Sequence, residues 1–377
     1  MSTKSGLTRR GFFTKAGQGL AVAHLSGAFL ARASAEAVAP PPGRKVGWAV
    51  VGLGSLSINQ ILPAFAKSER SRVVALVSGH RDKAERLALR YGVDPKSIYN
   101  YENYDQIRDN PDVDVIYVVL PNGMHAEYTV RGHEAGKHVL TEKPMANTPG
   151  ECEAMIAAAR KASRKLMVAY RCRYEPYNQA MIKMARDKEL GEVKVILADH
   201  GFNIGDPTQW RLNRKLAGGG SLMDIGIYSL QAARYVSGEE PIEVGAMMYS
   251  TPGDVRFKEV EEAIDFELRF PSGILANCTS SYGYSGQNRY RVVTTQGWFE
   301  LEPATGYSGQ RMRVHKGNVT EERDLPVRDH FALEMDHMSE CVQENKNPLT
   351  PGEEGLRDLK IMMAIYEAAR SGKTVKT

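Results

Sequence analysis

The chain has 377 residues, of which 42% are hydrophobic and 25% are charged, so it is long enough for two packed domains and is neither disordered nor fibrous. Its formal charge of +4 comes from the N-terminus. The first 35 residues contain five basic residues and no acid, and the remainder has 44 basic against 45 acidic residues, a net charge of −1. A body so close to neutrality excludes a basic surface for nucleic acid or anionic membrane.

Residues 1–35 have the order of regions found in a signal peptide. Arg9 and Arg10 precede two phenylalanines, a weakly apolar stretch covers residues 16–30, and small residues predict cleavage near Ala35. The alternative is a disordered basic leader. We expect export by the twin-arginine machinery to the periplasm, with no membrane association after cleavage. Because that route carries folded proteins, it favours a tightly bound cofactor. The proline-rich residues 36–44 predict an extended arm.

A nucleotide-binding domain is predicted over residues 45–168. A buried-strand pattern at residues 45–51 runs into a glycine turn at residues 52–57, and a helix is expected over residues 58–68. Gly52 permits the tight turn and Gly54 lets a pyrophosphate approach the backbone at the helix N-terminus. Because a serine occupies the place of the third glycine, this pattern alone does not exclude an ordinary strand-turn-helix.

The second strand, at residues 72–78, lacks the terminal acid that would hold the ribose of NAD. Residues 78–83 instead read Ser-Gly-His-Arg-Asp-Lys, which we interpret as a turn offering a hydroxyl, a backbone amide and cations to a 2′-phosphate. The alternative is a solvated turn whose charges have no such role. The pattern favours NADP over NAD.

Strands and helices continue to alternate along this domain. Strands are expected at residues 113–120, 137–141 and 166–170, with helices at residues 125–135 and 148–162 between them. This alternation predicts an α/β Rossmann fold with a doubly wound parallel sheet. Ligands bind at the carboxyl ends of such strands, where this chain has the sequences Leu120-Pro121-Asn122 and Glu142-Lys143-Pro144.

A second domain, at residues 169–350, is predicted to be α+β with a large, open, mainly antiparallel sheet, used for substrate binding and oligomerisation. Its expected strands cover residues 192–201, 243–250, 262–270, 273–281, 289–295 and 298–301. Short connections at residues 271–273 and 296–297 indicate hairpins. We expect the open face to pair with a second copy in a homodimer or homotetramer.

The helical parts of this domain follow from local signals. Residues 218–220 are glycines that allow a close backbone approach, and Ser221 is expected to cap a helix over residues 222–236. Further helices are expected at residues 331–344 and 353–371, the last packing back on the nucleotide domain. We interpret Glu334, Asp336 and His337 as surface positions of a helix and expect no metal site. The four cysteines are expected to be free and mostly buried.

These motifs resemble the glucose-fructose oxidoreductase, inositol dehydrogenase and rhizopine-catabolism family over essentially the whole mature chain, and within it the glucose-fructose oxidoreductase subgroup, including aldose-aldose variants. The resemblance rests on residues 51–54, 78–83, 120–122, 142–145, 170–172, 210–212 and 217–228. Many family members have histidine where this chain has Tyr228, whereas the subgroup is similar to this chain. The resemblance implies a sugar oxidoreductase.

The catalytic residues are expected on the helix that follows the glycines. Asp224 and Tyr228 are four residues apart and share one face. Oxidation of a sugar at C1 needs a base for the hydroxyl proton, and we assign this role to Tyr228. A nearby cation must stabilise the phenolate. Lys143 is expected either to supply it or to donate directly to the sugar, and Asp224 to orient the ring.

The remaining expected contacts form two groups. The cofactor is expected to touch Gly52, Leu53, Gly54, Ser55, Leu56, Ser78, Gly79, His80, Arg81, Lys83, Leu120, Pro121, Asn122, His125, Glu142, Lys143, Arg171, Trp210 and Arg211. The substrate is expected to touch Lys143, Arg171, Tyr174, Asp224 and Tyr228. Each of Arg171, Tyr174, Trp210 and Arg211 is equally compatible with a structural role.

The leading hypothesis is an exported oxidoreductase with a tightly bound, non-exchanging NADP. It would oxidise an aldose to its lactone and then pass the hydride to a second sugar, a ketose or an aldose, in a ping-pong reaction. The periplasm offers no nicotinamide pool, so the second sugar must regenerate the cofactor. Two alternatives are an exported NAD-dependent glycosidase of the same fold and a sugar-binding protein without activity.

Overall fold

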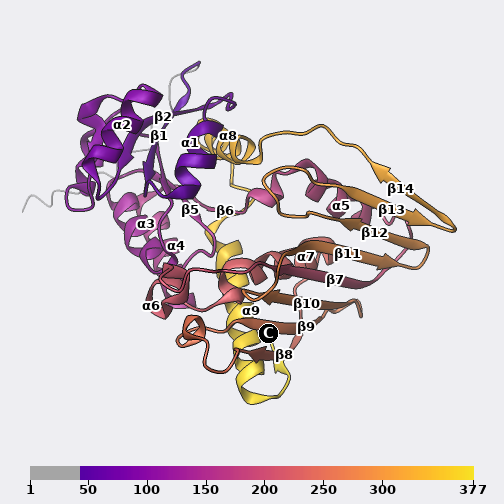
Figure 1. Cartoon of the computed structure of the whole chain (residues 1–377). Helices are drawn as coiled ribbons and strands as arrows, with labels where there is room; N and C mark the ends of the chain where they lie inside the picture. The colour runs from indigo at the N-terminus through magenta and orange to yellow at the C-terminus, as the bar shows by residue number, and fades with distance from the viewer. Residues whose placement is uncertain (1–42) are drawn as a thin grey trace, which may run out of the picture. The chain divides into compact units, whose positions relative to one another are not determined.

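The computed structural model describes residues 43–377, so the predicted signal peptide and nearly all of the proline-rich arm lie outside the described residues. Residues 43–377 form a six-stranded parallel sheet and a nine-stranded mixed sheet (Figure 1). Both parts of the predicted fold class, the α/β Rossmann domain and the α+β domain with a large open sheet, are therefore confirmed. No helix in this part of the chain is long and apolar enough to cross a membrane.

The parallel sheet has the strand order β3-β2-β1-β4-β5-β6, which is that of a doubly wound fold. Its strands are β1 (Val46–Val51), β2 (Ser71–Val77), β3 (Ile98–Tyr99), β4 (Val115–Val118), β5 (His138–Glu142) and β6 (Leu166–Ala169). Every residue of β1 is buried. Trp48 and Val50 face one hydrophobic cluster, whereas Ala49 and Val51 face another, as expected of a sheet covered on both sides.

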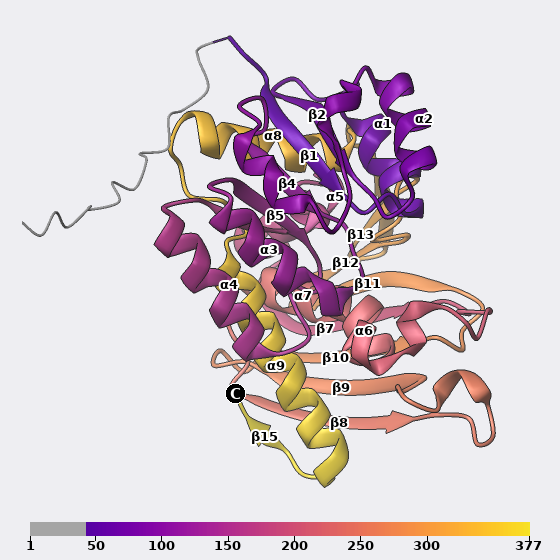
Figure 2. The same cartoon turned by 90° about the vertical axis from the view of Figure 1, so that its left-hand side faces the viewer.

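Helices cover both faces of this sheet. Residues of α1 (Leu62–Ala64), α2 (Arg81–Tyr91) and α8 (His330–Gln343) belong to the hydrophobic cluster of Trp48. On the opposite face, α3 (His125–Glu134) and α4 (Pro149–Ala162) lie side by side (Figure 2). A capping box between Thr148 and Glu151 fixes the start of α4.

Two local predictions in this domain differ in detail. A helical stretch follows the glycine turn as expected, but it covers residues 55–64, comprises a π-helical turn, Ser57–Ile61, and the short α1, and ends before residue 68; Pro63 donates no backbone N–H within it. The turn expected at residues 78–83 ends at His80, because Arg81, Asp82 and Lys83 form the first turn of α2. The unpaired backbone amides of that first turn therefore add their partial positive charge to the positive charge of Arg81 and Lys83.

The nine-stranded sheet has the order β14-β13-β12-β11-β7-β10-β9-β8-β15. Its strands are β7 (Val193–Gly201), β8 (Glu243–Tyr249), β9 (Ala263–Arg269), β10 (Leu275–Ser281), β11 (Gln287–Thr294), β12 (Gly297–Leu301), β13 (Met312–Lys316), β14 (Val319–Arg323) and β15 (Val375–Lys376). All neighbours are antiparallel except β7 and β10. The predicted hairpins β9–β10 and β11–β12 are confirmed, whereas β13 to β15 were not predicted.

One face of this sheet is covered and the other is open. Strand β9 alternates buried Ile264 and Phe266 with exposed Asp265 and Glu267. The covered face contacts α5 (Pro176–Arg186), α7 (Ile227–Ser237) and α9 (Gly352–Ser371). The last of these helices lies against β8 and also against α4 and β6 of the parallel sheet.

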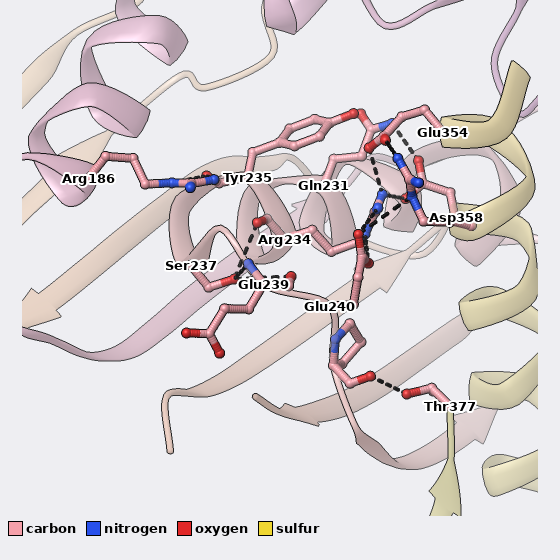
Figure 3. A network of polar contacts seen from close by, with 12 residues as sticks. Arg186, Gln231, Arg234, Tyr235, Ser237, Glu239, Glu240, Glu354, Asp358 and Thr377 are labelled. Atoms are coloured by element: carbon pink, nitrogen blue, oxygen red, sulfur yellow. Dashed lines mark hydrogen bonds and ion pairs between the residues drawn. The ribbon is translucent and has the colours of Figure 1, made fainter. Parts of the chain in front are cut away.

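Helix α9 is tied to α7 by a polar network around a buried arginine, which we call the Arg234 cluster: Arg234, Gln231, the half-exposed Glu240, Glu354 and Asp358 (Figure 3). The guanidinium of Arg234 lies 2.6 Å and 2.7 Å from the two oxygens of Glu240, 3.1 Å from Glu354, and in contact with Asp358. The other Asp358 oxygen accepts from Gln231 at 2.8 Å. Each of the three nitrogens of this guanidinium therefore has an acidic partner.

Candidate functional site

In the glycine turn after β1, one glycine packs closely against a neighbouring backbone segment and the other leaves free space beside the backbone. Gly52 has φ of +91°, and a Cβ there would meet the carbonyl oxygen of Val119 at 2.1 Å, so only glycine fits. A Cβ on Gly54 would meet no atom within 4 Å. Ser57 donates its hydroxyl to the Gly52 oxygen at 2.5 Å. The turn thus leaves room for a phosphate beside the unpaired amides of the following helical turn.

Cationic and hydroxyl groups gather beside this turn. The Lys83 ammonium donates to the Leu53 oxygen at 3.3 Å, and the Ser78 hydroxyl accepts from the His80 amide at 3.0 Å. Arg81 is exposed and pairs with Glu85 on the next turn of α2. No acid stands at the end of β2. These donors fit the additional phosphate of NADP better than the ribose hydroxyl of NAD.

The loops after β4 and β5 are held together by His125. Its two ring nitrogens lie 2.7 Å from the Leu120 oxygen and 2.9 Å from the Pro144 oxygen. Asn122 donates to the Ala217 oxygen, at the end of α6 (Arg214–Ala217). With both nitrogens occupied by backbone oxygens, His125 has a positioning role in this structure, and not the direct cofactor contact expected from the sequence.

A π-helical turn, Leu222–Gly226, precedes α7, and a distant carboxylate caps it. Glu261 accepts from the amides of Gly220 and Leu222 at 2.9 Å and 3.0 Å, and from the Tyr366 hydroxyl at 2.8 Å. A Cβ at Gly220 would meet the backbone carbonyl oxygen of Glu261 at 2.0 Å. The predicted cap by Ser221 was wrong, because Ser221 already has helical torsion angles and its hydroxyl donates to Ser280.

Asp224, on this π-helical turn, is the centre of the Asp224 cluster, which comprises Asp224, Lys143, Arg211 and Tyr282. The Lys143 ammonium lies 3.2 Å from the carboxylate and 2.5 Å from the backbone oxygen of Asp224. Arg211 and Tyr282 donate to the second carboxylate oxygen at 2.8 Å and 3.2 Å. Burial favours the neutral acid, but these cations outweigh it and hold the pKa of Asp224 at about 2.

Tyr228 lies one turn further along, within reach of two cations. Arg171 donates to its hydroxyl at 3.2 Å, and the Lys143 ammonium lies 4.9 Å from the centre of its ring. Burial raises the pKa of Tyr228, whereas the positive charge of Arg171 opposes that rise. The sequence had suggested Lys143 as the cation of the phenolate. In the structure Arg171 contacts the phenol oxygen, and Lys143 bridges Asp224 and the ring face.

The surroundings of Arg171 contain groups that sequence reasoning missed. Arg171 donates to the Thr305 oxygen at 2.6 Å, and its guanidinium lies 4.9 Å from the ring of Tyr307 and 5.7 Å from that of Phe331. Its Nη1 atom and both ring nitrogens of His330 are buried without a partner in the described part of the chain. These unpaired polar atoms can form hydrogen bonds with hydroxyl groups of a ligand.

Three predicted residues lie elsewhere or play a different part. Tyr174 is not at the site, because its hydroxyl lies 3.2 Å from Thr350 and its side chain belongs to the hydrophobic core. Trp210 stacks on the guanidinium of Arg211, 4.6 Å away. Glu334, expected at the surface, is fully buried because it faces Tyr117 on β4.

Metal and disulfide chemistry have no support within residues 43–377. No group of three His, Cys, Asp or Glu side chains in this range could hold a metal ion. The four cysteines are free, and Cys152, Cys278 and Cys341 are buried, as predicted. The described site is therefore built from a nucleotide turn, charged side chains and tyrosines.

Family models match two segments of the chain. Residues 46–170 match the oxidoreductase family with an NAD-binding Rossmann fold, and residues 178–300 match the GFO/IDH/MocA C-terminal domain. A curated relative, D-xylose 1-dehydrogenase [NADP(+)] of Haloarcula marismortui, is 29% identical over 343 residues, covering 88% of this chain and 93% of the relative.

Solved structures give the same result. The aldose-aldose oxidoreductase of Caulobacter crescentus, crystallised with glycerol, is 51% identical with a TM-score of 0.87, covering 89% of this chain and all of that one. The 3-ketoreductase KijD10 of Actinomadura kijaniata, in complex with NADP and TDP-benzene, is 25% identical with a TM-score of 0.77, covering 86% and 98% of the two chains. The chain therefore belongs to the GFO/IDH/MocA family of sugar oxidoreductases.

Proposed function

We propose that the protein oxidises an aldose at C1 to its lactone with NADP and then reduces a second sugar to an alditol. A single observation carries the proposal: the Tyr228 hydroxyl contacts Arg171 while the ionised Asp224 and Lys143 lie beside it. Bound NADP would supply the hydride acceptor and donor of this chemistry. The glycine turn, Ser78, Arg81 and Lys83 are the residues that would hold it.

The side chains divide the remaining work. Tyr228 takes the proton of the C1 hydroxyl, and the positive charge of Arg171 stabilises the phenolate that remains. Asp224 is ionised and accepts a hydrogen bond from a neighbouring sugar hydroxyl. Lys143 donates to a sugar oxygen and at the same time keeps Asp224 oriented. The return of the proton from Tyr228 completes the reduction of the second sugar.

The N-terminus supports a version of this activity that needs no cofactor pool. Residues 1–35 have the pattern of a twin-arginine signal, which implies a periplasmic protein that folds around its cofactor before export. In that compartment a non-exchanging NADP must be regenerated by the second sugar, in a ping-pong reaction. The similarity to an aldose-aldose oxidoreductase supports an aldose as this acceptor.

The open face of the nine-stranded sheet supports assembly as a homodimer or homotetramer. This face exposes Leu197, Met247 and Leu275 together with ion pairs such as Arg289–Asp199. A second copy would bury the apolar side chains and form further ion pairs with the charged side chains of this face. Sedimentation equilibrium should give a mass of at least two chains, and a monomer at micromolar concentration would contradict the assembly.

The most direct test of the activity is to purify the protein without added cofactor, denature it and identify what is released. Stoichiometric NADP is expected. In a separate native sample, addition of an aldose should produce one equivalent of reduced cofactor, and a second sugar should reoxidise it. Lys83→Ala should lose nucleotide, whereas Lys96→Ala, on the surface after α2, should retain it. Release of NAD, or of nothing, would contradict the proposal, as would turnover of a glycoside without net oxidation.

A further inference from the structure

Behind the site, one tyrosine hydroxyl lies between two buried carboxyl groups. Tyr117 Oη lies 2.7 Å from Glu142 Oε1 and 3.4 Å from Glu334 Oε2. Glu142 is 9% exposed and Glu334 is fully buried. A tyrosine hydroxyl has one hydrogen, so it donates to only one of these groups, and the shorter distance identifies Glu142 as the acceptor.

The number of donors differs between these two carboxyl groups. The second oxygen of Glu142 accepts from the Lys143 amide at 3.2 Å. The second oxygen of Glu334, Oε1, has no partner among residues 43–377. By comparison, the buried Glu261 accepts from three donors, each of which favours its anion and opposes the rise in pKa that burial causes. An ionised Glu334 would be a buried charge without any donor of its own, a costly arrangement.

A protonated Glu334 removes this difficulty. Its own O–H can donate to the oxygen of Tyr117, which in turn donates to the carboxylate of Glu142, so that each hydrogen of the chain has an acceptor. Neither carboxyl group is among the ion pairs of the described residues, because Lys143 and Arg211 both pair with Asp224. The burial of both side chains also raises the pKa values of Glu142 and Glu334.

The pair lies close to Arg171. Glu334 follows Phe331 by three residues on α8, so the two side chains share a face, and the Phe331 ring packs on the Arg171 guanidinium. The titratable groups that face the pair from neighbouring elements are Tyr117, Lys143, Arg171, Cys172, Tyr174, Tyr228 and Tyr307. Within this group Arg171 is a cation without a carboxylate in contact, and it also contacts the Tyr228 hydroxyl.

We propose that Glu142 and Glu334 share one proton through Tyr117 and that the single negative charge of this pair is the counter-charge of Arg171. Glu334 is thus a positioning residue that acts on Tyr228 through Arg171. Loss of the shared proton leaves two buried negative charges, which oppose formation of the Tyr228 phenolate. The inference rests on the proposed function where it concerns Tyr228, whereas the shared proton rests on the contacts and burial of Glu142, Tyr117 and Glu334.

The shared proton can be observed without catalysis. Protein labelled with ¹³C at the glutamate carboxyl should show, by NMR at pH 7, one protonated glutamate, and the signal should be lost in Glu334→Gln. Tyr117→Phe should alter the signal by removing the hydroxyl that bridges the two carboxyl groups. This variant tests the shared proton if Glu334→Gln does not fold. A wild-type spectrum with every glutamate ionised would overturn the proposal. So would a protonated signal that survives in Glu334→Gln and disappears in Glu261→Gln.

The effect on Tyr228 is measured by the pH profile of kcat. In the wild type kcat should decline at alkaline pH as the pair loses its proton. In Glu334→Gln the pair is fixed at one charge, so the ratio of neutral to alkaline kcat should fall by about threefold to tenfold relative to the wild type. Glu340→Gln, on the outer side of α8, should keep the wild-type profile. An unchanged profile in Glu334→Gln would overturn the role of Glu334, even if the NMR signal were found.

Discussion

Two clusters of charges flank the same helix, and the charged groups in and beside them differ in how completely they are paired. The Arg234 cluster, at the end of α7, surrounds its guanidinium with three acids from two segments, the loop after α7 and helix α9 (Figure 3). The Asp224 cluster, before α7, adjoins Arg171 and His330, whose side chains keep buried polar atoms without partners in the described residues. Full pairing fixes α7 and α9 together, whereas incomplete pairing is what a ligand needs. The difference concerns the guanidinium groups of Arg234 and Arg171, since the Tyr235 hydroxyl beside the Arg234 cluster is also buried without a partner in the described residues.

The largest expected effect concerns the phenol oxygen. Tyr228→Phe removes the proposed base and should lower kcat by about a thousandfold, within the range for general acid-base residues, while nucleotide content stays the same. Steady-state kinetics and nucleotide analysis measure both. Tyr235→Phe, on the same helix in contact with the Arg234 cluster, is the matched control and should retain activity. Normal turnover by Tyr228→Phe would remove the basis of the functional assignment.

A matched loss of stability is expected at the other end of the helix. Asp358→Asn leaves the 3% exposed Arg234 with one acid fewer and should lower the free energy of unfolding by about 3–5 kcal/mol. Urea unfolding measures this loss, and kcat per folded molecule should remain near that of the wild type. A large drop in kcat without a change in stability would show that the two clusters are not distinct.

The corresponding change in the Asp224 cluster should lower activity more than it lowers stability. Asp224→Asn removes the ionised acceptor and should lower kcat/KM by about a hundredfold, or about 2.7 kcal/mol. Its effect on unfolding should be smaller than that of Asp358→Asn, because the Arg211 side chain is 34% exposed and water can replace the lost partner. Equal destabilisation by the two variants would contradict this comparison.

The smallest expected effect is on stability in acid. Burial lowers the pKa of His200 to about 3, so its neutral form stabilises the fold fully above the unfolded pKa of about 6.5. That contribution is lost progressively as the pH falls from 6.5 toward 3. The loss amounts to about 2 kcal/mol at pH 5. His200→Gln should reduce the difference in unfolding free energy between pH 7 and pH 5. An equally steep fall in the variant would contradict a buried neutral His200.

Local patterns made much of this molecule predictable. The glycine turn, the alternating strands and the spacing of Asp224 and Tyr228 depend on neighbouring residues, and the sequence was sufficient for them. The contacts of Arg171 with Thr305 and of Tyr117 with Glu334 join residues more than 130 positions apart, and no local pattern encodes them. Ser221 is instructive, because a serine before a helix is a common cap but a buried glutamate 40 residues later performs this role.

The contact between Glu261 and Tyr366 has a consequence for how the protein is made. Tyr366 lies in α9, so it is synthesised after all strands of the parallel sheet and after the π-helical turn that carries Asp224. That turn cannot obtain its complete cap until α9 has left the ribosome. A nascent chain that stops before α9 should therefore form the parallel sheet but lack a functional sugar site.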